Sequence, residues 1–428
     1  RPARLGACLL ALAGGAALHA ADEPATTITD AFAKGSFGGD LRYRLDDYKD
    51  DRFSKDTAVA STFRTALHYG TKAFHDVSGY VELYDNAVIG NDLYNDTKLF
   101  STGTSNTNGV NRPFIFDPPG RGVNEMYGKF ADKDLWDTTI KVGRQLFTIN
   151  DEVFITASRY RQNNNRFDAA TVESHPLVPA LTVQYGYLWN NIDVSDASNP
   201  LRTQVGNVKY SIKDVGSFGV YGILLRFRDE SRANAGFASG DVATEGIRLD
   251  GPFKIDDKWS VIYEADLAQQ KDTSINTAHI DAKYLLVHAG LSYEQWYLSA
   301  GYRRQSGQSS SSDHQFEASQ LGYPWPWRGN TEQMVLTPVD GLKTIMVWGG
   351  GAIPQVDGLS FDVWYFKFDS EQNSISYGSE YSAALNYVMP FDKKWWLSGL
   401  IAKAKDGDQG NGDFGDSTRA VFMTGYSF

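Results

Sequence analysis

The residues of this chain best suited to chemistry are arginines and a carboxylate gathered in the stretch 141–171. This stretch contains Arg144, Arg161, Arg166 and Asp168. A guanidinium group stays charged at any ordinary pH and can bind a carboxylate through two parallel hydrogen bonds. Arginines placed along a channel wall can therefore pass an anionic solute from one site to the next. The alternative is that these arginines pair with neighbouring acids and only solvate a polar wall.

Signatures of catalysis and of cofactor binding are absent from the sequence. No Gly-x-Ser-x-Gly, phosphate-binding loop or His-Glu-x-x-His motif occurs. The only cysteine, Cys8, lies in the N-terminal segment, so the rest of the chain has no thiolate ligand for a metal. The acidic run 406–413 lacks the ligand pattern of an EF-hand calcium loop. We therefore expect no enzyme activity, no metal and no cofactor.

The elements that must position the arginines are segments of about ten residues with alternating polarity, which predict β-strands. No run of about eighteen apolar residues follows the N-terminal segment, so membrane-crossing helices are not expected. Eighteen strand-like segments recur along the chain, at 36–47, 59–69, 77–88, 122–130, 138–147, 166–173, 181–191, 202–212, 218–228, 242–249, 259–268, 278–288, 296–304, 342–350, 360–368, 377–388, 395–404 and 417–428.

The connections between these segments alternate in length. Every second connection is short, and most of the others are longer, up to 89–121 and 305–341. Outer-membrane barrels have short periplasmic turns and long outer loops. The last segment, 417–428, carries Phe422 and Phe428 on one face, which suits a strand that pairs with the first strand and leaves no apolar edge. We predict an all-β, antiparallel, up-and-down transmembrane barrel of about 18 strands.

The N-terminal segment has the layout of a secretory signal. Arg1 and Arg4 precede a short apolar run, and small residues come before the acidic pair that starts at Asp22. We predict a signal peptide over 1–21 and a single barrel domain over 22–428. With an even number of strands, both termini fall on the periplasmic side of a bacterial outer membrane.

The alternation also assigns side chains to the barrel interior. Arg42 and Arg44 share one face of the first segment, and Arg64 lies on the polar face of the second. These three arginines are predicted to line the lumen. Glu82 is predicted to hold an arginine in place, and Asp168 is assigned the same role.

Four motifs stand out within 143–169: Gly143-Arg144-Gln145, Asn150-Asp151 with Phe154, Tyr160-Arg161-Gln162-Asn163 and Phe167-Asp168-Ala169. Together they resemble the alginate-export family of outer-membrane barrels. That resemblance implies an eighteen-stranded barrel with an arginine-lined constriction for an acidic sugar polymer, with Arg144 and Arg161 as its leading contact residues. One departure is the brief turn 389–394, where the exporter has a longer periplasmic loop that helps to occlude the pore.

Composition and loop content complete the prediction. The net charge of −11 argues against nucleic acid as a partner. Trp325 and Trp327, each next to a proline in a long loop, are candidates for stacking on sugars, and 89–121 is long enough to fold into the lumen. We expect outer-membrane lipid and lipopolysaccharide around a barrel that is a monomer rather than a trimer. Two alternatives stay open: a substrate-specific porin for small carboxylates or cations, and a non-conducting surface adhesin or structural barrel.

Overall fold

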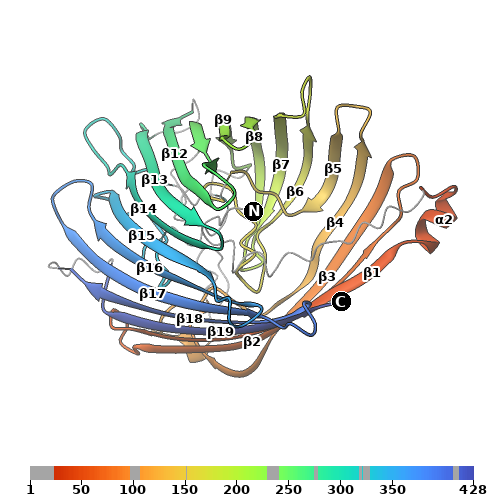
Figure 1. Cartoon of the computed structure of the whole chain (residues 1–428). Helices are drawn as coiled ribbons and strands as arrows, with labels where there is room; N and C mark the ends of the chain where they lie inside the picture. The colour runs from red at the N-terminus through yellow and green to blue at the C-terminus, as the bar shows by residue number, and fades with distance from the viewer. Residues whose placement is uncertain are drawn as a thin grey trace.

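One closed sheet of antiparallel strands makes up the fold (Figure 1). The computed structural model describes residues 24–96, 107–150, 152–228, 241–273, 278–317, 321, 328–407 and 414–428. The strands are β1 (Ser36–Asp50), β2 (Thr57–Gly70), β3 (Val77–Leu93), β4 (Gly120–Asp132), β5 (Thr138–Gln145), β6 (Arg166–Ser174), β7 (Leu181–Ile192), β8 (Ser198–Ile212), β9 (Gly216–Leu225), β10 (Val242–Asp250), β11 (Phe253–Lys254), β12 (Trp259–Asp272), β13 (Asp281–Tyr293), β14 (Trp296–Gln305), β15 (Leu342–Ala352), β16 (Leu359–Asp369), β17 (Ser376–Val388), β18 (Trp395–Asp406) and β19 (Ser417–Ser427).

The first and last strands close the barrel. β1 pairs antiparallel with β2 on one side and with β19 on the other, so β1 lies between the two; Figure 1 shows the first and last strands running together at the bottom of the view. The two-residue β11 pairs with the same strand as β10, namely β12. β10 and β11 therefore occupy one strand position of an eighteen-stranded barrel. The predicted fold class is confirmed, because each of the eighteen predicted segments overlaps one strand of the barrel wall.

The two faces of the wall differ in polarity. Outward side chains such as Leu298, Tyr381 and Ile401 are 62%, 62% and 57% exposed. Their strand neighbours Ser382 and Ala402 point inward and are buried. Side chains on a strand alternate between its two faces, so an apolar outer face and a more polar inner face follow from the sequence pattern.

The barrel wall carries little other regular structure. The short helix α2 (Ile28–Ala33) precedes β1, and the side chain of Thr27 caps it by accepting a hydrogen bond from the backbone N–H of Asp30. A single 3-10 turn, η1 (Thr107–Gly109), lies in the connection between β3 and β4. In the described part of the chain, no helix is long and apolar enough to cross a bilayer.

Long connections fold back into the barrel and pack on its inner wall. Phe154, from the connection between β5 and β6, lies 5.4 Å from Tyr221 and 5.5 Å from Tyr284, measured between ring centroids. Phe316, from the connection between β14 and β15, stacks on Tyr284 at 5.3 Å. These rings belong to one large buried apolar cluster. The interior is therefore partly filled by the chain itself.

Candidate functional site

Buried arginines gather on the inner face near the seam between β1 and β19. Arg42 and Arg44 alternate with outward residues of β1 and are only 5% and 1% exposed. Arg64 of β2 lies directly opposite Arg42 across the strand pair. The three arginines assigned to the lumen by alternation thus all lie on the inner face.

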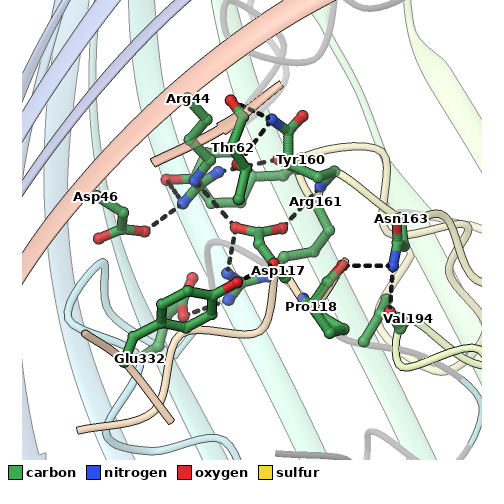
Figure 2. A network of polar contacts seen from close by, with 12 residues as sticks. Arg44, Asp46, Thr62, Asp117, Pro118, Tyr160, Arg161, Asn163, Val194 and Glu332 are labelled. Carbon is green, nitrogen blue, oxygen red and sulfur yellow. Dashed lines mark hydrogen bonds and ion pairs between the residues drawn. The ribbon is translucent and has the colours of Figure 1, made fainter. Parts of the chain in front are cut away.

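Three guanidinium groups and three carboxylates alternate in a closed circuit of ion pairs, which we call the ionic ring. Its contacts include Arg419 to Glu332 at 2.6 Å and Arg161 to Asp117 at 3.5 Å. Every side chain in the ring is at most 5% exposed. Figure 2 shows most of the ring. In order around the circuit its members are Arg44, Asp46, Arg419, Glu332, Arg161 and Asp117.

The ionic ring joins segments that are far apart in the sequence. Arg44 and Asp46 come from β1, and Arg419 comes from β19. The other three members come from three separate connections: β3 to β4, β5 to β6, and β14 to β15. The equal numbers of acids and bases make the ring neutral, which suits burial, since an unpaired charge would be costly there. The ring therefore fixes three inward-folded segments to the seam of the barrel.

Tyr160 and Glu332 show how tightly the ionic ring is held. The Arg44 guanidinium carbon lies 4.4 Å from the centre of the Tyr160 ring, and Arg44 Nη1 donates a hydrogen bond to the Tyr160 carbonyl oxygen at 3.1 Å. Burial raises the pKa of the Tyr160 hydroxyl, although Arg44 and Arg419 oppose that shift. Burial alone would raise the pKa of Glu332 too, but Arg161 and Arg419 outweigh it and hold that pKa below its usual value. Glu332 is therefore a charged partner of two arginines.

Amide side chains next to the ionic ring fix the connection between β5 and β6. Gln162 receives a hydrogen bond on its side-chain oxygen from Arg42 Nε at 2.8 Å and donates from its backbone N–H to Asp117 at 2.7 Å. Asn163 donates to the carbonyl oxygens of Pro118 and Val194 at 3.0 and 3.1 Å, as Figure 2 shows. The Arg-Gln-Asn run noted in the sequence thus has a clear structural role.

Arg42 differs from the arginines of the ionic ring. It donates to the Gln162 side chain, to the Arg159 carbonyl oxygen at 3.0 Å and to the Arg161 carbonyl oxygen. All three acceptors are neutral, and within the described residues Arg42 forms no ion pair. It also faces Arg64 directly, although like charges in opposite positions normally destabilise a strand pair. Arg42 therefore contributes a positive charge that is not neutralised by direct contact.

Two other predicted residues have acidic partners. Arg64 forms ion pairs with Asp40 and, at 3.1 Å, with Glu82, so Glu82 does hold an arginine. Arg166 is buried and forms an ion pair with Asp196. Both guanidinium groups also approach Tyr84, at 6.0 and 4.9 Å from its ring centre.

Arg144 lies on the outer face of the barrel, contrary to the role predicted for it in the lumen. It shares its face of β5 with Ile140 and Val142, which are 37% and 52% exposed, and its partner on β4 is the exposed Met126. Asp168, directly opposite on β6, holds it through Nε at 2.8 Å. The expected pairing of arginine and acid is present, but alternation along β5 turns both side chains away from the lumen. Neither residue enters the functional proposal below.

The sequence prediction missed four members of the ionic ring. Asp46 and Arg419 lie on the inner faces of β1 and β19, where alternation would have identified them. Asp117 and Glu332 lie in irregular connections, so no periodic pattern assigns their side chains to a face. Trp325 and Trp327, the predicted sugar contacts, lie outside the described residues. Within the described ranges, no group of histidine, cysteine, aspartate or glutamate side chains could hold a metal ion.

Comparison with known proteins places the fold among porins. No protein-family model matches the sequence, and a search of curated proteins finds no match. Pseudomonas aeruginosa OccK9 (OpdG) has a TM-score of 0.70 at 13% identity, covering 93% of this chain and 99% of that one. A BenF-like porin from Pseudomonas fluorescens has a TM-score of 0.67 at 12% identity, with coverage of 93% and 99%. Pseudomonas aeruginosa OccK2 (OpdF), solved with glucuronate, has a TM-score of 0.66 at 12% identity, with coverage of 92% and 98%.

At these identities the likeness concerns the fold alone. The chain is an eighteen-stranded antiparallel barrel of the kind seen in these porins, which are channels. The expected resemblance to the alginate-export family is not supported, because no family model matches. The structures that share the fold include Occ proteins and a BenF-like porin.

Proposed function

We propose that this protein is an outer-membrane channel for small anionic solutes, such as organic acids with one carboxylate. The observation that carries the proposal is Arg42, an inner-face guanidinium that is held by neutral acceptors and lies opposite Arg64. Such a charge attracts anions and can bind a carboxylate in passing. One structure with the same fold, OccK2 (OpdF), was solved with the carboxylate sugar glucuronate.

The fixed interior favours small solutes over a polymer. Three connections meet at the ionic ring and are tied to the seam by buried ion pairs. Removing one partner from a buried ion pair costs about 3–5 kcal/mol, so these segments do not swing aside easily. A sugar polymer would need a continuous wide path, whereas a small acid needs only a narrow one. The alternative of a porin for small carboxylates is therefore preferred to polymer export.

The proposal also covers where in the cell the protein lies. The outer face is apolar and can meet lipid, with lipopolysaccharide as the expected neighbour in the outer leaflet. We place both termini, and the short turns, in the periplasm. We also propose that the protein acts as a monomer and binds no nucleic acid.

Reversal potentials of single channels in a salt gradient test this function. Wild-type protein in a planar bilayer should conduct, prefer chloride to potassium and be blocked by glucuronate. Arg42→Gln should reduce the anion preference and weaken the block by about tenfold, the effect of losing roughly 1.4 kcal/mol of binding. Arg304→Gln, on the outer face, is the matched control and should behave as wild type. An absence of conductance would favour a closed structural barrel, and unchanged selectivity in Arg42→Gln would reject the assigned role.

A further inference from the structure

Arg303 of β14 is a buried guanidinium on the part of the inner wall formed by β13 to β15. It is 1% exposed. Its partners directly across the neighbouring strands are Leu286 and Thr344, both completely buried. Its hydrogen bond runs from Nη2 to Thr344 Oγ1 at 3.4 Å, and its Nε has no partner. The group is therefore poorly satisfied for a buried cation.

No carboxylate among the described residues forms an ion pair with Arg303. The charged side chain that acts electrostatically on Arg303 is another cation, Arg328, from the connection between β14 and β15. Arg328 also lies near Glu317, a buried acid of the same connection. Tyr284 lies on the same face of β13 as Leu286, the residue directly opposite Arg303, and its buried hydroxyl has no hydrogen-bond partner. Two cations and an unused hydroxyl thus occur together, without an acid in contact with Arg303.

The contrast with the ionic ring is informative. There, each buried guanidinium touches two carboxylates, and the charges balance. Burying an unpaired charge costs several kcal/mol unless a partner arrives. In a barrel open to salt solution, the available partner is an anion from that solution.

We propose that Arg303 binds a small monovalent anion, held between its Nε and the Tyr284 hydroxyl. Both groups can donate hydrogen bonds, and a halide or a carboxylate can accept them. This inference deepens the proposed function, because it adds a second anion site on a different part of the inner wall from Arg42. The inference concerns equilibrium binding of an anion at Arg303. An experiment that tests this binding is therefore separate from one that tests conduction.

Anomalous diffraction locates the anion directly. Crystals of the wild-type protein are soaked in sodium bromide, or in 4-bromobenzoate, which carries a carboxylate and a bromine atom. A bromide peak within hydrogen-bonding distance of Arg303 supports a halide site. A 4-bromobenzoate molecule with its carboxylate on Arg303 supports a site for the solute. Absence of both overturns the proposal, whether or not the channel conducts.

A second experiment compares anion binding by the wild-type protein and by two variants. The melting temperature of the purified barrel in detergent is measured at increasing concentrations of sodium bromide. Bound anion should raise it by on the order of 2 °C per tenfold increase in bromide above the dissociation constant. Arg303→Met should lose this increment, while Arg304→Gln, the next residue on the opposite face, should retain it. Equal salt dependence in all three proteins overturns the proposal, and if Arg303→Met does not fold, the diffraction result decides alone.

Discussion

Asp46 and Arg419 form a two-point ion pair across the seam at which the barrel closes. Arg419 donates from Nε to Asp46 Oδ1 at 2.8 Å and from Nη2 to Oδ2 at 2.7 Å, and both side chains are completely buried. The two residues lie 373 positions apart in the sequence but on hydrogen-bonded neighbouring strands. Closure of the sheet and assembly of the ionic ring are therefore coupled.

Arg419→Met should destabilise the barrel strongly. The change removes one arginine partner from each of Asp46 and Glu332, so the buried ring is left with excess negative charge. We expect a loss of about 3–5 kcal/mol, the usual cost of removing one partner of a buried pair. Thermal unfolding in detergent, followed by the gel shift between folded and unfolded barrel, measures it. The double change Arg419→Leu with Asp46→Leu should cost less than the single one, and an equal or larger cost would contradict the ion-pair argument.

Arg161→Met should loosen the connection between β5 and β6 without unfolding the barrel. Arg161 lies in a connection and not in a strand, so, unlike Arg419, it joins no two strands of the wall across the seam. After the change Glu332 keeps Arg419 and Asp117 keeps Arg44. We expect noisier single-channel current and faster proteolysis of this connection. Arg159→Gln is the matched control, because Arg159 lies in the same connection and is more exposed, in an ion pair with Glu152 at 3.5 Å. Equal noise and equal cleavage in the two variants would show that the ring does not restrain this segment.

Arg144→Gln should leave ion selectivity unchanged. Its side chain is on the outer face, so its charge is separated from the lumen by the barrel wall. The variant leaves Asp168 with Asn190, which donates to it at 3.1 Å, so a small loss of stability is expected. Reversal potentials of Arg144→Gln and Arg42→Gln in the same salt gradient separate the two positions. A large shift in Arg144→Gln would place this side chain in the conduction path and contradict the geometry.

Glu317 should make stability depend on pH. Burial raises its pKa from about 4.5 to about 7. As the pH rises from 4.5 to 7, an unfolded carboxyl group loses its proton while the folded group keeps it. Stability should therefore fall through this window, by at most roughly 3 kcal/mol, and level off above pH 7.

Melting temperatures of the wild type and of Glu317→Gln between pH 4.5 and 8 check this dependence. The variant should lack the part of the pH dependence that belongs to Glu317. Glu245→Gln removes an exposed carboxylate and should follow the wild-type profile. If Glu317→Gln also follows that profile, Glu317 is not the source of the dependence.

Alternation of polarity was enough to predict the strands, because every strand of the wall turns one set of side chains toward the apolar surroundings and the other set toward the interior. It placed Arg42 on the inner face for the same reason. Arg144 was assigned from a motif instead, although Ile140 and Val142 in the same segment already indicated an outward face. Among the partners of the inner arginines, Glu82 of β3 was predicted, but the acids in irregular connections could not be. Asp117 and Glu332 reach the seam only through the course of irregular connections, and more than 200 residues separate them.

The ionic ring also has a consequence for biogenesis. Its members span the chain from Arg44 to Arg419, so a nascent or truncated polypeptide lacking β19 cannot complete either the ring or the barrel. Of the three inward connections, the one that carries Glu332 contacts the last strand directly, through Arg419, so the circuit of ion pairs cannot close before that strand is in place. Completion of the barrel and completion of the ring therefore depend on the same strand, and a fragment without that strand would expose an open sheet edge and leave Asp46 and Glu332 each without one arginine partner.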